Sequence, residues 1–231
     1  MKKSELIEAI KGNLIVSCQA LEGEPLYLEG DTIMHLMARA AKAAGACAIR
    51  TNGVRDVIAI REETGLPVIG LIKRPYPGYE PYITPTMKEV RELAEVNADI
   101  IAFDATARPR ADGRSLEEFI QEIRKTYPDL YLMADIASYE EGIAAALAGV
   151  DFVGTTMSGY TEETKNRPTP DYELVKRLAN DLDIPVLAEG RIHTPEVAKA
   201  MLEAGATAVV VGGAITRPLE ITQRFIEAMK G

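Results

Sequence analysis

Two residues that can move protons, Lys73 and Glu189, stand at the ends of short apolar segments of this chain. Lys73 ends "PVIGLIK" (67–73), and Glu189 lies within "PVLAEGRI" (185–192). A lysine that is desolvated among apolar segments, with cations nearby, has its pKa lowered towards neutrality, so it can act as a base or form a Schiff base with a carbonyl. We expect Glu189 to stay ionised beside a group of cations unless burial outweighs their effect.

Glycines and arginines gather after the last two apolar segments and predict a phosphate site. "AEGRI" contains Gly190 and Arg191, and "VVVGGAITRP" contains Gly212, Gly213 and Arg217. Glycine amides can approach an anion closely, as they do in many barrel proteins after the seventh and eighth strands. Two glycines alone could form only a tight turn, but the arginines beside them favour phosphate. Together with the lysine and the glutamate, they indicate proton transfer next to a carbonyl of a small phosphorylated metabolite.

Polar residues also end other apolar segments, and we expect their side chains to bind the substrate. They are Gln19, Arg50, Asp104 and Asp135. The two aspartates could hold Mg²⁺, accept hydrogen bonds from substrate hydroxyl groups, or pair with Arg50 and Lys73, and the residues alone leave these alternatives open.

Zinc and nucleotide motifs are absent from the sequence. The chain contains no H-E-x-x-H motif and no cluster of cysteine and histidine, and its 2 histidines, His35 and His193, lie far apart. We therefore expect no metal site. No G-x-S-x-G nucleophile motif and no P-loop pattern occurs either.

Short apolar segments alternate with helix-period segments from one end of the chain to the other. The apolar segments are nearly continuous in Val, Ile and Ala, as expected for parallel strands covered on both faces. They are residues 13–19, 47–51, 67–73, 99–106, 130–137, 151–159, 185–192 and 207–215. Two of the intervening helices open with a capping box, Ser115 with Glu118 and Ser138 with Glu141.

About eight strand–helix repeats in 231 residues predict an α/β fold, a single (β/α)₈ TIM barrel. A doubly wound open sheet is the competing fold, but the G-x-G-x-x-G turn typical of that class does not occur. We expect one domain over residues 1–231, with an extra N-terminal helix over residues 1–12 that closes the bottom of the barrel. Chemistry in such barrels sits at the carboxyl ends of the strands, where the polar residues named above fall.

The composition limits the partners and the compartment. A formal net charge of -9 argues against nucleic acid and anionic membranes as partners. The 2 cysteines, Cys18 and Cys47, suit a reducing compartment and exclude a disulfide framework. The N-terminal "MKKSELIEAIKGN" lacks the long apolar core of a signal peptide, and no apolar run could span a bilayer. We expect a soluble cytoplasmic protein.

These residues together resemble the N-acetylmannosamine-6-phosphate 2-epimerase family, barrel enzymes of the ribulose-phosphate-binding type that act in sialic-acid breakdown. The resemblance rests on strings that cover nearly the whole chain in the same order. They are "GNLIVSCQAL", "AIR", "PVIGLIKR", "YITPT", "DAT", "MADI", "GTTMSGYT", "AEGRI" and "VVGGAITRP". The implied reaction interconverts N-acetylmannosamine 6-phosphate and N-acetylglucosamine 6-phosphate by inversion of the carbon that carries the acetamido group.

The resemblance also implies roles for single residues. It implies that Lys73 and Glu189 are catalytic, and it needs neither a metal nor an organic cofactor. By the same resemblance, Gln19, Arg50 and Asp135 bind the sugar. Its phosphate-binding positions are the amides around Gly190, Gly212 and Gly213, with the side chain of Arg217.

Two loops depart from the family pattern, and other functions remain open. Residues 25–31 ("PLYLEGD") and 74–82 differ from the usual segments, so contacts between these loops and the sugar are not carried over. The alternatives are another phosphate-binding barrel enzyme, a lyase or synthase that uses Lys73 as a Schiff-base lysine, and a non-catalytic sugar-phosphate-binding protein. We expect a homo-oligomer, most simply a dimer, with apolar loops or the last helix as the interface.

Overall fold

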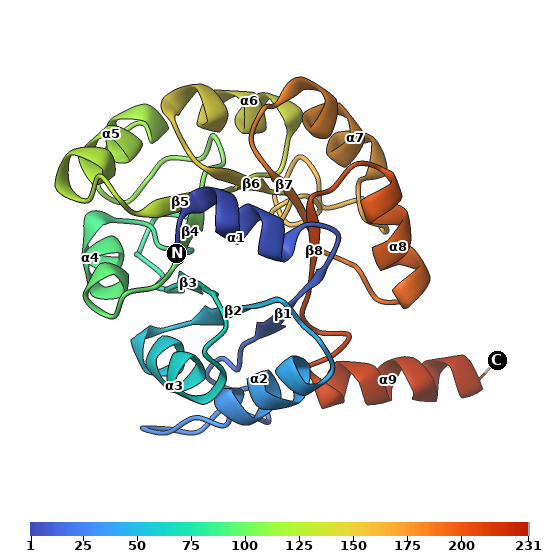
Figure 1. Ribbon diagram of the computed structural model, residues 1–231. Helices are drawn as coiled ribbons and strands as arrows, with labels where there is room; N and C mark the ends of the chain where they lie inside the picture. The colour runs from blue at the N-terminus through green and yellow to red at the C-terminus, as the bar shows by residue number, and fades with distance from the viewer. Residues whose placement is uncertain (231) are drawn as a thin grey trace.

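Eight parallel strands close into a barrel in the computed structural model of the protein, which describes residues 1–230 (Figure 1). Neighbouring strands follow one another in chain order, and β8 closes the barrel by pairing with β1. The barrel prediction is therefore confirmed. The strands are β1 (Leu14–Cys18), β2 (Ala48–Asn52), β3 (Val68–Leu71), β4 (Ile100–Asp104), β5 (Tyr131–Asp135), β6 (Phe152–Gly154), β7 (Val186–Glu189) and β8 (Ala208–Val211).

A helix follows each strand, and one more helix precedes the barrel. These helices are α1 (Lys3–Ile10), α2 (Met34–Ala43), α3 (Val54–Thr64), α4 (Met87–Glu95), α5 (Leu116–Thr126), α6 (Tyr139–Ala148), α7 (Tyr172–Asp181), α8 (Pro195–Glu203) and α9 (Pro218–Met229). Within residues 1–230, no helix combines the length and the apolar character that crossing a membrane requires.

Helix α1 lies across the barrel in Figure 1. Its Leu6 and Ile10 are buried in one cluster with barrel residues such as Ile15 and Ile69. Its Lys3 forms an ion pair with Asp151, which precedes β6.

Local sequence signals fix several helix ends. The side chains of Ser115 and Ser138 accept hydrogen bonds from the amides of Glu118 and Glu141, and both capping boxes are complete. Each such cap contributes about 1 kcal/mol because it satisfies amides that have no partner inside the helix. Helix α6 ends at Gly149 with φ 99°, a left-handed conformation that glycine adopts without a steric penalty.

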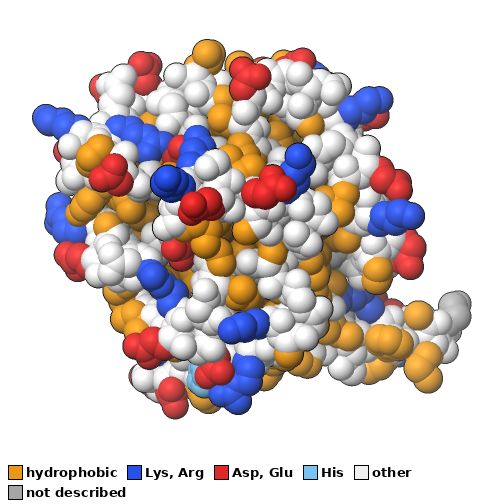
Figure 2. All heavy atoms as spheres, viewed as in Figure 1, with side chains coloured by type: hydrophobic (Ala, Val, Ile, Leu, Met, Phe, Trp, Pro, Cys, Tyr) orange, Lys and Arg blue, Asp and Glu red, His pale blue; other side chains and the backbone are white. Residues whose placement is uncertain are grey.

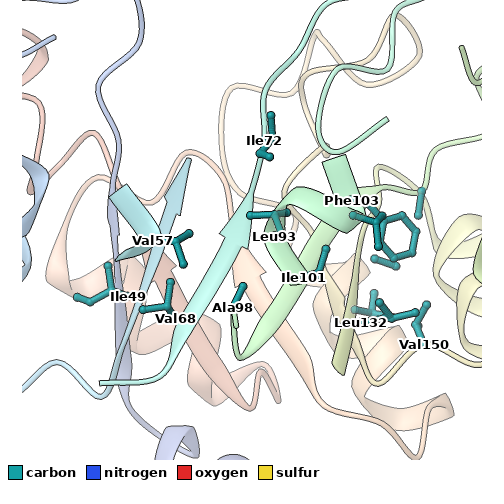
Figure 3. Close-up of a cluster of buried hydrophobic side chains, with 14 of the residues drawn as sticks. Ile49, Val57, Val68, Ile72, Leu93, Ala98, Ile101, Phe103, Leu132 and Val150 are labelled. Atoms are coloured by element: carbon teal, nitrogen blue, oxygen red, sulfur yellow. The ribbon is translucent and has the colours of Figure 1, made fainter. Parts of the chain in front are cut away.

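The main core lies between the strands and the surrounding helices (Figure 3). Ile49, Val68 and Ile101 on the strands pack with Val57 and Leu93 on the helices, and all five are fully buried. Burying one such side chain contributes about 1.5–3 kcal/mol. This rigid double layer holds the carboxyl ends of the strands in fixed positions.

Helix α9 is the exception, because none of its described side chains is buried. Figures 1 and 2 show it projecting from the barrel, with apolar side chains along its surface. Phe225 is 68% exposed and Met229 is 83% exposed.

Candidate active site

A cavity of about 330 Å³ opens at the carboxyl ends of the strands, at the lower end of the range for small-molecule sites. Nine of the eleven residues that the sequence analysis singles out line it. They are Gln19, Arg50, Lys73, Glu189, Gly190, Arg191, Gly212, Gly213 and Arg217. Asp104 and Asp135 are fully buried and are not among the lining residues.

Lys73 lies two residues beyond the end of β3, in a short hairpin that folds over the cavity. Its backbone amide donates to Asn52 Oδ1 at 2.7 Å, and it forms a bridge with Ile83 across the hairpin. Burial lowers the pKa of Lys73 to about 8, helped by the positive charges of Arg217 and Arg50. A substantial fraction of the amine is therefore neutral near physiological pH, as a base requires.

Arg50 and Asp135 form a buried ion pair beneath the cavity. Arg50 is 1% exposed, and its Nη1 and Nη2 donate to the two Asp135 oxygens at 3.1 and 2.6 Å. Burial alone would lower the pKa of Arg50, but the carboxylates of Asp135 and Glu189 raise it above its ordinary value. Of the pairings left open for Asp135, the structure has the one with Arg50, so this guanidinium is held rigidly in the cavity wall.

Glu189 shares the same arginine in a weaker contact. Its Oε1 lies 3.3 Å from Arg50 Nε. Burial raises the pKa of Glu189 to about 7, and the charge of Asp135 adds to the shift, while Arg50 and Lys73 oppose it. Burial thus outweighs the cations, and Glu189 carries a proton for part of the time near neutral pH.

The ends of β7 and β8 bring the glycines together. No described residue accepts a hydrogen bond from the amides of Gly212 or Gly213, so both can donate to a ligand. A side chain at either position would press on a neighbouring side chain, which would have to move. An added Cβ at Gly212 would lie 3.3 Å from Ser17, and one at Gly213 would collide with the carboxylate of Glu220.

The two arginines of this region face different partners. Arg217 is paired with Glu24, at 3.0 Å from Nη2 to Oε1, and lies 3.5 Å from Glu220. Arg191 has a left-handed backbone with φ 57°, and its Nη2 donates to the carbonyl of Gly159 at 2.5 Å. The side chain of Arg191 therefore ties down the loop after β6.

Asp104 is buried and does not line the cavity. It lies opposite Asp135 in the register of β4 and β5, but its carboxylate accepts hydrogen bonds from Thr106 and Arg108. It does not pair with Lys73. Within residues 1–230, no group of three His, Cys, Asp or Glu side chains is placed to hold a metal ion.

The structure adds lining residues that the sequence analysis did not select. They are Ser17, Tyr82, Ile83, Thr156, Met157, Tyr160, Ile192, His193, Val210 and Glu220. Tyr82 comes from the divergent loop 74–82, whose Arg74 is anchored by Glu89 and Glu92. Thr156 belongs to a threonine pair directly after β6, a position that the barrel pattern itself marks. Most of the other residues lie within the strings that carry the resemblance, but only the structure shows that they face the cavity.

The chain is similar to the proteins of one family along most of its length. A family model described as "Putative N-acetylmannosamine-6-phosphate epimerase" matches residues 34–231. A putative N-acetylmannosamine-6-phosphate 2-epimerase from Caldanaerobacter subterraneus subsp. tengcongensis is 54% identical over 226 residues, which cover 98% of this chain and 94% of the relative. A relative of the same name from Enterobacter sp. (strain 638) is 52% identical and covers 97% of this chain and 96% of the relative.

Solved structures agree with the barrel. The N-acetylmannosamine-6-phosphate 2-epimerase from Clostridium perfringens aligns with a TM-score of 0.91 at 49% identity, over 96% of both chains. A thiamine phosphate pyrophosphorylase from Pyrococcus furiosus aligns with a TM-score of 0.62 at 20% identity, a likeness of fold alone.

Proposed function

The chain belongs to the N-acetylmannosamine-6-phosphate epimerase family, and on this premise we propose that it interconverts N-acetylmannosamine 6-phosphate and N-acetylglucosamine 6-phosphate. The observation that carries the proposal is the shared cavity of Lys73, Glu189 and the free amides of Gly212 and Gly213. A base, an acid and an anion site within one cavity are what epimerisation of a sugar phosphate needs.

Lys73 is the group that exchanges the proton at C2. This proton becomes acidic only after the sugar ring opens to the aldehyde. The C2–H bond then breaks, the proton goes to Nζ of Lys73, and the electron pair is delocalised onto the carbonyl oxygen. Return of a proton to the opposite face of C2 inverts that carbon.

The surrounding groups assist these steps. Glu189 supplies and removes the proton that ring opening and closure require. Arg50 and Gln19 polarise the carbonyl or the acetamido oxygen and stabilise the negative charge of the intermediate. Asp135 acts through Arg50, which it fixes at 2.6 Å.

The phosphate group binds at the carboxyl ends of β7 and β8. The amides of Gly190, Gly212 and Gly213 donate to it, and the backbone of Arg191 completes this loop. Arg217 exchanges its contact with Glu24 for one with the phosphate.

Solvent exchange at C2 tests this function. N-acetylglucosamine 6-phosphate in D₂O should incorporate deuterium at C2 with the wild-type protein, and Lys73→Ala should lose at least about a hundredfold in rate because the base is missing. Normal turnover by Lys73→Ala would exclude this role. Borohydride trapping of the substrate on Lys73 would instead favour the Schiff-base lyase or synthase, since simple proton transfer leaves no reducible imine.

We further propose that two copies associate through α9. The support is its apolar surface, since Leu219, Phe225, Ile226 and Met229 are each 46–83% exposed. Phe225→Glu should convert a dimer into a monomer in light scattering after size exclusion. A wild-type monomer at micromolar concentration would contradict this.

The unpaired Cys18 and Cys47 support cytoplasmic action. The single domain over residues 1–231, with residues 1–12 covering the bottom of the barrel, stays a prediction that the burial of Leu6 and Ile10 supports.

A further inference from the structure

The loop after β6 supplies two adjacent hydroxyl groups that contact Glu189 in different ways. Thr155 Oγ1 accepts from the Glu189 amide at 3.1 Å and donates to the Glu189 carbonyl oxygen at 3.0 Å, so it fixes the backbone. Thr156 Oγ1 lies 3.2 Å from the side-chain Oε2 of Glu189 and 2.7 Å from Asp135 Oδ1. Thr156 therefore stands between the two carboxyl groups that share Arg50.

Thr156 can donate a hydrogen bond in only one of these two contacts. A threonine hydroxyl has one hydrogen to donate and lone pairs that accept. The contact with Asp135 is the shorter of the two, 2.7 Å against 3.2 Å to Glu189, and 2.7 Å is in the range of a hydrogen bond to a charged carboxylate. The hydrogen of Thr156 therefore points to Asp135, and its lone pairs face Glu189 Oε2. Two oxygen atoms without a hydrogen between them repel, so the contact is favourable only when Glu189 carries the proton.

Arg50 also forms better hydrogen bonds with Asp135 than with Glu189. Asp135 receives two well-formed hydrogen bonds from it, whereas Arg50 Nε, which lies nearest to Glu189, has no hydrogen-bond partner in the described part of the chain. The charged groups that face Glu189 are Arg50 on β2, Asp135 on β5 and Lys73 after β3. One buried arginine cannot neutralise two carboxylates, so one carboxyl group tends to keep a proton. Glu189, with the poorer contact and a pKa raised to about 7 by burial, is that group.

We propose that Thr156 is a positioning residue whose hydroxyl group accepts a hydrogen bond from protonated Glu189 and so raises the fraction of Glu189 that carries a proton on Oε2 in the substrate-free site. This inference rests on the proposed function, in which Glu189 is the acid that opens the sugar ring. Gly154, the last residue of β6, leaves space beside the Thr156 hydroxyl group because it has no side chain. An added Cβ there would collide with Met133 and would lie 3.2 Å from Thr156 Oγ1.

The test measures the protonation of Glu189 without substrate. Infrared difference spectra of the ligand-free protein, recorded from about pH 5 to about pH 9, report the carbonyl band of protonated carboxyl groups. The band that Glu189→Gln lacks belongs to Glu189, and in the wild-type protein it should disappear around pH 7. Thr156→Val keeps the shape of threonine but removes the hydroxyl group. It should move this titration down by about one pH unit, the size expected for one lost hydrogen bond.

Two variants serve as controls. Thr156→Ser retains the hydroxyl group and should titrate like the wild-type protein. Thr155→Val removes the neighbouring hydroxyl group, which contacts only the backbone of Glu189, and should leave the titration in place. If Thr156→Val does not fold, as judged by circular dichroism, Thr156→Ala removes the same hydroxyl group and carries the same expectation.

The sign of the shift decides between the two roles of Thr156. An upward shift would mean that Thr156 donates to a charged Glu189, and an unchanged titration would mean that it does not act on the proton; either result overturns the inference. Because no substrate is needed, the two proposals fail separately. If the wild-type protein shows no deuterium exchange at C2 but Thr156→Val shifts the Glu189 titration down, only the epimerase function is refuted. If exchange is normal but Thr156→Val shifts the titration up, only the role of Thr156 is refuted.

Discussion

The pH dependence of C2 exchange tests the pairing of Lys73 with Glu189. Burial, helped by Arg217 and Arg50, lowers the pKa of Lys73 to about 8, and burial raises the pKa of Glu189 to about 7. In the reactive form the pair carries one proton in total: Glu189 is protonated and Lys73 is neutral. The other form with one proton, placed on Lys73, is the more populated of the two, because Lys73 has the higher pKa.

A bell-shaped profile follows from these values. Below about pH 7 a second proton enters the pair and Lys73 has no neutral form left, so the rate falls about tenfold per pH unit. Above about pH 8 the last proton leaves the pair and no acid remains, so the rate falls again. The maximum of kcat/KM should lie between these two values.

The variant Glu189→Gln assigns the two sides of the bell. Glutamine does not titrate, so the fall above about pH 8 should disappear. The rise on the acidic side should remain and follow the titration of Lys73 alone, whose pKa lies below about 8 in the variant because the carboxylate that raises it is gone. Proton NMR in D₂O follows the C2 hydrogen over hours and so measures even a slow variant. A wild-type rate independent of pH from about 6 to 9, or an unchanged bell in the variant, would refute the pairing.

Three further predictions concern the framework and the anion site. Asp135→Ala leaves Arg50 buried without its partner and should lower the free energy of unfolding by about 3–5 kcal/mol in urea titrations; a loss below about 1 kcal/mol would contradict the buried pair. Ser115→Ala removes a helix cap far from the cavity and should cost about 1 kcal/mol with kcat and KM unchanged; a change in either constant would show coupling to the site. Inorganic phosphate should inhibit competitively and raise the melting temperature, less so in Arg217→Gln; an equal rise in both proteins would place the anion elsewhere.

Much of the fold could be predicted because its signals are local. Continuous apolar runs of strand length indicate strands covered on both faces, and Ser115 and Ser138 mark helix starts through contacts three residues away. Eight such repeats close into a barrel, which the likeness to the Clostridium perfringens structure confirms. Seven of the eight predicted strands run too long at their carboxyl ends; the exception is the prediction for β2. β6, for example, ends at Gly154 because the following residues turn into the loop that carries Thr156.

The same reasoning found most of the candidate site. Parallel strands point their carboxyl ends to one side, so polar residues that end different strands must meet. Lys73, Glu189, Gly212 and Gly213 line one cavity for this reason. Their functional roles stay predictions until the exchange experiment is done.

The pairing of the charged side chains was decided only by the tertiary structure. Asp104 and Asp135 end neighbouring strands and look equivalent in the sequence, yet Asp104 pairs with Arg108, only four residues away. Arg50, distant in sequence, takes Asp135.

The sequence by itself thus determined the barrel and the side of it on which the chemistry lies, because periodicity and strand direction are properties of the chain. Only the tertiary structure decided that burial outweighs the cations around Glu189, which is therefore protonated part of the time near neutral pH, and that Lys73 is buried deeply enough for the lowered pKa that its position in the sequence predicts. Both pKa values depend on burial and on which charge lies within a few ångströms, and these depend on how strands far apart in the sequence pack together.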